Sequence, residues 1–113
     1  MSKGIGRSEI EAYDPRQVGR VVVKHGFYAG LETPLEDSGL VIGRGREADL
    51  VIAESTISRA HARIDPGAGD GWLLQDLGST NGTHVNGSQV TTQRLADGDE
   101  IRMGRLVLGI QLD

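Results

Sequence analysis

The sequence contains no cysteine, and aromatic residues make up only 4% of its 113 positions. Without cysteine the chain cannot form a disulfide, bind zinc through thiolates or use a thiol as a nucleophile. The composition therefore gives no sign of an oxidising compartment, and we expect a cytoplasmic protein. The sequence also lacks an apolar run long enough for a secretory signal or a membrane-spanning helix, so we expect no membrane insertion.

Positive charge is also scarce, because 12 lysines and arginines stand against 16 acidic residues and give a formal net charge of -4. Proteins that bind nucleic acid or anionic membranes through a summed basic field carry the opposite balance. We therefore expect no nucleic-acid partner. Any anion that this chain binds must be held by a local group of cations.

Glycine, by contrast, is abundant, with 17 residues, and no stretch has the period of an amphipathic helix. Short apolar runs alternate with turn residues from Arg20 onwards. The clearest run is the last, in which every second residue is a large aliphatic one: Leu106, Leu108, Ile110 and Leu112. Strands of this length and spacing predict an all-β fold, an antiparallel β-sandwich of about ten to eleven short strands.

Residues 1–19 differ from the rest of the chain, because they contain few large apolar residues and follow no period. We interpret them as a flexible N-terminal extension and residues 20–113 as one compact domain. Both a complete small adaptor and one domain of a larger signalling protein fit a chain of this length.

Residues 59–65 alternate in polarity, which predicts a strand with two distinct faces. One face would carry Ala60, Ala62 and Ile64, and the other Arg59, His61 and Arg63. Further along, Asn86-Gly87 is a strong signal for a type I′ hairpin between two short strands.

Three polar segments lie between apolar runs of strand length. They are Ile42-Gly43-Arg44, Ser58-Arg59-Ala60-His61, and Gly78 to Gly82 followed by Val85-Asn86-Gly87. Loops held by a rigid sheet are common places for recognition. We therefore expect these segments to form ligand loops at one end of the sandwich.

The side chains of these loops suit an anion. The planar guanidinium of Arg44 can donate two parallel hydrogen bonds to a phosphate, and the Ser58 hydroxyl can donate a further one. The amide of Asn81 can bind the main chain of an extended peptide. Each residue also has a simpler interpretation: Arg44 as a surface partner of Glu47 or Asp49, and the other two as turn residues.

Taken together, the three segments resemble the forkhead-associated (FHA) domain family, whose pattern is a Gly-Arg, then Ser-x-x-His, then Asn-Gly. The resemblance covers roughly residues 20–112. It implies a sandwich that binds a phosphothreonine-containing segment of a partner protein in Ser/Thr kinase signalling, without a cofactor. It assigns phosphopeptide binding to Arg44, Ser58, Arg59, Thr80 and Asn81, and structural support of the site to Gly43, His61, Gly82, Asn86 and Gly87.

Two other classes of function stay open from the residues alone. A phosphate-independent scaffold or oligomerisation domain could use the same sandwich. A small hydrolase would need Ser58 and His61 as nucleophile and base, but the sequence nominates no group to orient the base and no oxyanion hole, so we expect no catalytic residue. The three histidines also lack metal-ligand spacing, so we expect no metal site.

Overall fold

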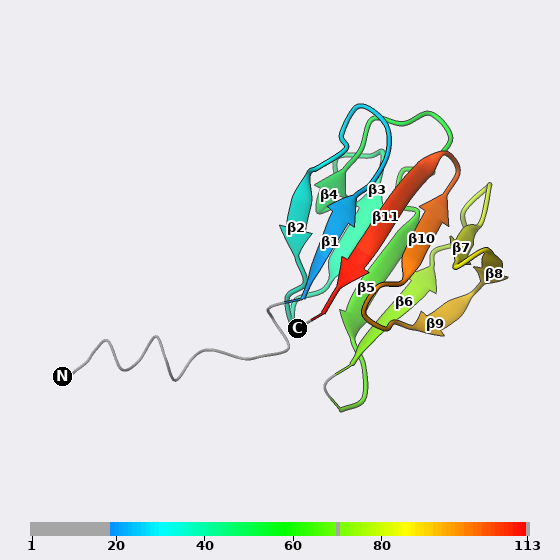
Figure 1. The fold of residues 1–113 in the computed structure, drawn as a ribbon. Coiled ribbons are helices and arrows are strands. Elements are labelled where there is room, and N and C mark those ends of the chain that lie inside the picture. The colour runs from blue at the N-terminus through cyan, green and yellow to red at the C-terminus, as the bar shows by residue number, and fades with distance from the viewer. Residues whose placement is uncertain (1–18, 70, 113) are drawn as a thin grey trace.

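The chain folds into two stacked β-sheets (Figure 1). The structure, a computed structural model, describes residues 19–69 and 71–112, and these residues contain no helix. The first sheet has six strands, in the order β2 (Glu32–Pro34), β1 (Arg20–Val23), β11 (Leu106–Gln111), β10 (Glu100–Met103), β7 (Thr83–Val85) and β8 (Ser88–Val90). The second has five, in the order β4 (Leu50–Val51), β3 (Leu40–Gly43), β5 (Ala62–Pro66), β6 (Trp72–Asp76) and β9 (Thr92–Arg94). The predicted β-sandwich is confirmed.

Strand pairing is antiparallel throughout the recorded ladders except between β3 and β4, which run parallel. β1 and β11 pair along their length, from Arg20 opposite Gln111 to Val23 opposite Leu108. This pairing brings together the two ends of residues 19–112, and it places the first and last strands side by side inside the sheet, whose edge strands are β2 and β8.

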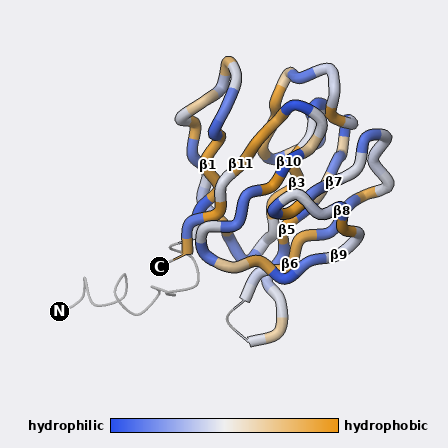
Figure 2. Tube along the Cα trace, turned by 45° about the vertical axis from the view of Figure 1, so that its right-hand side comes forward, coloured by the Kyte–Doolittle hydropathy of each residue, from blue (hydrophilic) through white to orange (hydrophobic). Residues whose placement is uncertain are grey.

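The core lies between the two sheets and consists mainly of inward-facing aliphatic residues of the central strands, together with a few loop residues such as Leu35 and Ile57. On β11 the predicted alternation is confirmed, because Leu106, Leu108 and Ile110 are buried. Trp72 and the other large residues of the second sheet pack against them. Figure 2 shows hydrophobic residues gathered along the strands, while most connecting loops are hydrophilic. Such a core leaves the loops at the sandwich ends free for polar side chains.

Two local predictions were incomplete. Strand β9 was not foreseen, because Thr92–Arg94 is a short polar edge strand with no apolar alternation. The alternation over residues 59–65 was wrong at its start: residues 59 and 60 form a turn, and the strand begins only at Ala62. The turn rotates His61 inwards, so this side chain is completely buried instead of lying beside Arg63.

The β7–β8 hairpin turns at Asn86-Gly87, as the sequence predicts. Both residues have positive φ, 50° and 89°, which is the conformation of a type I′ turn. The Asn86 amide donates to Asp99 Oδ1 over 3.0 Å and accepts from the main-chain N–H of Glu100 over 3.0 Å. Asn86 thereby fastens the hairpin to the start of β10.

The expected N-terminal extension, residues 1–19, lies outside the described residues except for Gly19. Within the described part of the chain, no helix is long and apolar enough to cross a membrane.

Candidate functional site

The loops that follow β3, β4 and β6 are joined to one another by main-chain hydrogen bonds. The N–H of Arg44 donates to the carbonyl of Ser58 over 3.0 Å, and the N–H of Gly45 to that of Arg59 over 3.0 Å. The N–H of Thr80 donates to Ser58 Oγ over 3.1 Å. The structure therefore brings together residues of all three segments that the sequence singles out.

Gly43 makes this approach possible at the end of β3. A Cβ atom on Gly43 would collide with the carbonyl oxygen of Arg59 on the neighbouring loop. Any larger residue would push the Ser58 loop away from Arg44. The requirement here is close approach of two backbones, and not an unusual φ angle.

Arg44 is exposed and reaches its position through one bond, from Nε to the carbonyl oxygen of Ile57 over 2.9 Å. The ion pair with Glu47 or Asp49 that the sequence left open does not form. Glu47 lies 3.5 Å from Arg59 Nη2, and Asp49 accepts the N–H of Val41 over 2.8 Å. Within residues 19–69 and 71–112, the terminal nitrogens of Arg44 have no carboxylate partner.

His61 is the buried polar residue beneath these loops. Its Nδ1 accepts the main-chain N–H of Ser58 over 3.0 Å, and its Nε2 lies 2.9 Å from the carbonyl oxygen of Gly82. This network requires the neutral tautomer with the proton on Nε2. Because the ring bonds to the main chain of Ser58 and not to its hydroxyl, the pair lacks the geometry of a nucleophile and its base.

Asn81 and Thr80 are both exposed at the tip of the β6–β7 loop. Asn81 Nδ2 donates to the carbonyl oxygen of Thr56 over 2.7 Å, which ties this loop to the one after β4. Gly82 follows in the left-handed conformation, with φ of 81°, and turns the chain into β7. Among residues 19–69 and 71–112, no group donates a hydrogen bond to the Asn81 side-chain oxygen.

Sequence reasoning missed Asp76, which organises the β6–β7 loop. Its carboxylate accepts hydrogen bonds from the N–H groups of Gly78 and Ser79 and from the hydroxyls of Ser79 and Thr83. Burial acts to raise the pKa of Asp76, but these donors outweigh it and lower the pKa below the ordinary value. The Asp-Leu-Gly-Ser sequence is typical of an Asx turn and was a usable signal.

A second missed group supports the loop after β4 from the β10–β11 turn. Glu54 accepts from the hydroxyl and N–H of Thr56 and from the guanidinium of Arg105. The Thr56 hydrogen bonds, more than the nearby Arg105, lower the pKa of Glu54. A Cβ on Gly104 would collide with Thr56, so the two loops are in close contact. Thr56, whose carbonyl accepts the hydrogen bond from Asn81, is therefore held in place by Glu54 and by the β10–β11 turn.

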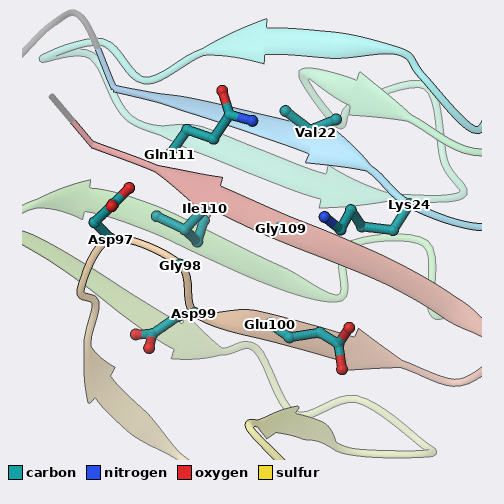
Figure 3. Close-up of a pocket in the computed structure, with 9 residues that line it drawn as sticks. All are labelled: Val22, Lys24, Asp97, Gly98, Asp99, Glu100, Gly109, Ile110 and Gln111. Carbon is teal, nitrogen blue, oxygen red and sulfur yellow. The ribbon is translucent and has the colours of Figure 1, made fainter.

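A cavity of about 330 Å³ lies elsewhere, on the outer face of the six-stranded sheet (Figure 3). Asp97, Asp99 and Glu100 line one side of it and Lys24 the other. Three carboxylates around one amine repel a phosphate. Asp97 and Asp99 also serve the neighbouring turns, by accepting the N–H groups of Leu112 and Ala96. This cavity is no candidate for the anion site.

Metal binding finds no support in the described residues, which contain no group of three or more histidine, aspartate or glutamate side chains able to hold an ion. The fold and its loops instead define a class of protein, a β-sandwich that presents a small polar recognition site on three connected loops.

Comparisons with known proteins identify the family within this class. The model of the FHA domain matches residues 40–104, more than half of the chain. The FHA domain-containing protein FhaB of Mycolicibacterium smegmatis is 37% identical over 98 residues, which cover 85% of this chain and 63% of FhaB. The chain belongs to the forkhead-associated (FHA) domain family, as its three motifs predict. It spans less than two thirds of the length of FhaB.

Solved structures agree with this assignment. One, from a structural and functional analysis of phosphothreonine-dependent FHA domain interactions, has a TM-score of 0.77 and 35% identity, and the match covers 84% of this chain and 96% of that one. The FhaA FHA domain complexed with the intracellular domain of Rv3910 has a TM-score of 0.75 and 35% identity, and the match covers 82% of this chain and 99% of that one.

Proposed function

We propose that this domain is a phosphothreonine-dependent protein-binding module that docks an extended phosphorylated segment of a partner protein in Ser/Thr kinase signalling. The observation that carries the proposal is the guanidinium of Arg44, which has no carboxylate partner among the described residues and lies on a loop that is hydrogen-bonded to the Ser58 loop. Family membership and the phosphothreonine-dependent interactions studied for a similar FHA structure support it.

Arg44 and Ser58 would hold the phosphate. A phosphoryl group carries close to two negative charges and three acceptor oxygens at neutral pH. The two terminal nitrogens of Arg44 would donate to two of these oxygens as a fork. Ser58 Oγ already accepts from Thr80, so its own proton is free to be donated to the phosphate. Arg59 would exchange its long contact with Glu47, an exposed ion pair of little strength, for the ligand.

Asn81 and Thr80 would read the peptide next to the phosphate. The Asn81 amide can bind peptide main chain with its free oxygen, and Thr80 offers an exposed hydroxyl. His61, Gly43 and Gly82 would keep the loops at the required separation, while Asn86 and Gly87 hold the hairpin further away. No residue in this arrangement is assigned a catalytic role, so we propose that the domain is a binding module and not an enzyme. We propose a cytoplasmic setting, where kinases and ATP are available.

The test is selection from a degenerate peptide library with a fixed phosphothreonine, followed by calorimetric titration of the selected peptide. The same peptide with phosphoserine or unmodified threonine serves as the control. Binding that requires phosphothreonine supports the proposal. A folded domain that binds none of the peptides would refute it and favour a phosphate-independent scaffold.

A further inference from the structure

The β1–β2 loop holds an aromatic side chain almost entirely in water. Phe27 is 95% exposed, and its ring packs only edge-on against Tyr28, with centroids 5.2 Å apart. An isolated apolar side chain on a surface needs no explanation, but Leu31 on the same loop is also exposed, by 43%. The β1–β2 loop thus presents two apolar side chains to solvent.

The loop that carries Phe27 is well ordered by its own hydrogen bonds. The N–H of Val23 donates to the carbonyl of Leu31 and the N–H of Gly30 to that of Val23, both over 2.8 Å. Gly26 and Gly30 supply the positive φ angles that the turns need. The loop projects beyond the sheets (Figures 1 and 2). The backbone that carries Phe27 is thus held in place, which lowers the entropic cost of ordering this loop when a ligand binds against it.

A small cavity of about 70 Å³ opens beside Phe27, between its loop and the loop after β4. Tyr28 forms one wall and accepts the N–H of Ala53 over 3.4 Å. Glu54 and Arg105 also line the cavity and neutralise each other as an ion pair at 3.2 Å. A cavity with an aromatic edge and a neutralised polar wall suits an apolar side chain better than a charged one.

Two hydrogen bonds connect a residue that lines this cavity with a residue of the proposed phosphopeptide site. Glu54 in its wall holds Thr56, and the carbonyl of Thr56 binds Asn81. A peptide that lies along Asn81 and passes over Thr56 would therefore arrive at Glu54 and then at Phe27. This connection favours the same ligand as the occupant over an unrelated one.

We propose that Phe27 and the cavity beside it bind an apolar side chain of the phosphorylated segment, several residues from the phosphothreonine on the side of Thr56. This inference rests on the proposed function and deepens it. It makes Phe27 a specificity-determining residue at a distance from the phosphate.

The test is a degenerate phosphothreonine library with about eight randomised positions on each side, or ~26 Å of extended chain, which allows the peptide to pass well beyond the loops. We expect enrichment of aliphatic or aromatic residues at a distal position on one side only. Phe27→Ala removes this enrichment and keeps the phosphothreonine requirement. Leu73→Ala, which removes another exposed apolar side chain from β6, leaves the whole profile unchanged.

A double-mutant cycle then isolates the contact. The selected peptide loses roughly tenfold in affinity on Phe27→Ala, as expected for burial of a phenyl ring. A peptide with alanine at the distal position is also weakened, and Phe27→Ala weakens it no further. The alanine peptide tests the contact on the unaltered protein, so the result does not depend on how well the variant folds.

The other results overturn the proposal in distinguishable ways. Phosphothreonine-dependent binding without a distal preference overturns this inference and leaves the proposed function standing. No phosphothreonine-dependent binding overturns both. A dimer in sedimentation that Phe27→Ala abolishes would assign the surface to a second copy of the chain. Nuclear Overhauser contacts from the Phe27 ring to residues 1–18 would assign it to the chain's own N-terminal segment.

Discussion

Replacing Arg44 by alanine removes the guanidinium from the loop cluster and leaves the main chain that joins the loops intact. The loss for binding is large, because two charge-assisted hydrogen bonds to phosphate contribute about 1.5 to 3 kcal/mol each. A combined loss of about 3 kcal/mol or more lowers affinity at least ~100-fold. The loss for folding is smaller, since Arg44 is exposed and makes one bond to the Ile57 carbonyl, which contributes about 1 kcal/mol.

Calorimetric titration with the selected phosphothreonine peptide measures the loss of affinity on Arg44→Ala, and thermal unfolding measures the loss of stability. The unfolding midpoint of Arg44→Ala falls by no more than about 4 to 8 °C. Arg46→Ala is the matched control, because it removes the same charge from an exposed position on the same loop. Arg44→Lys keeps the charge without the fork and recovers only part of the affinity. If Arg44→Ala and Arg46→Ala weaken binding equally, Arg44 contributes only general charge and the assigned fork is wrong.

Three further predictions concern the support of the site and the ligand. His61→Ala leaves a cavity and two unpaired main-chain groups, so it lowers the free energy of unfolding in urea by about 2 to 4 kcal/mol and weakens peptide binding as well. The control is His84→Ala, at a half-buried histidine whose Nδ1 has no partner among the described residues, and it lowers the free energy of unfolding by less than about 1 kcal/mol. Equal losses of stability in the two variants would contradict the role given to His61. Replacing phosphothreonine by phosphoserine weakens binding about tenfold, if a pocket holds the γ-methyl group; equal affinities exclude such a pocket. The lowered pKa of Asp76 means that its contribution to stability is complete above the ordinary aspartate pKa of about 3.9 and disappears as the pH falls through the lower, folded value. Urea unfolding below pH 4 therefore shows a steeper loss for the wild type than for Asp76→Asn, and parallel curves would refute the argument.

The fold was predictable where strands are apolar on one face. The alternation of Leu106, Leu108 and Ile110 located β11 and its inward face, and Asn86-Gly87 located a hairpin and its turn type. Thr92–Arg94 was not predictable in this way, because an edge strand buries little and its pairing with β6 comes from main-chain hydrogen bonds that leave no pattern in the sequence.

The sequence allowed us to predict which exposed groups make up the candidate site. It gave less information on the residues that hold these groups in position. Arg44 and Asn81 stand in recognisable motifs, and their chemistry can be stated residue by residue. The inward position of His61 was missed, since alternation assumes that a strand is already regular, and here a turn precedes Ala62. The role of Thr56 depends on Gly104, 48 positions away, and no local pattern links the two.

The polar groups at this end of the sandwich fall into two sets with different duties. The first set is buried or half-buried and is represented by His61 and Asp76. Its side chains form hydrogen bonds with main-chain and hydroxyl groups of the loops. The exposed set, represented by Arg44 and Asn81, uses one nitrogen each to fix its position and keeps the remaining groups open. Because the first set fixes the loops before any ligand arrives, the proposed ligand groups of the second set would already be in place for a phosphopeptide, and little of the binding energy would be lost in ordering the site.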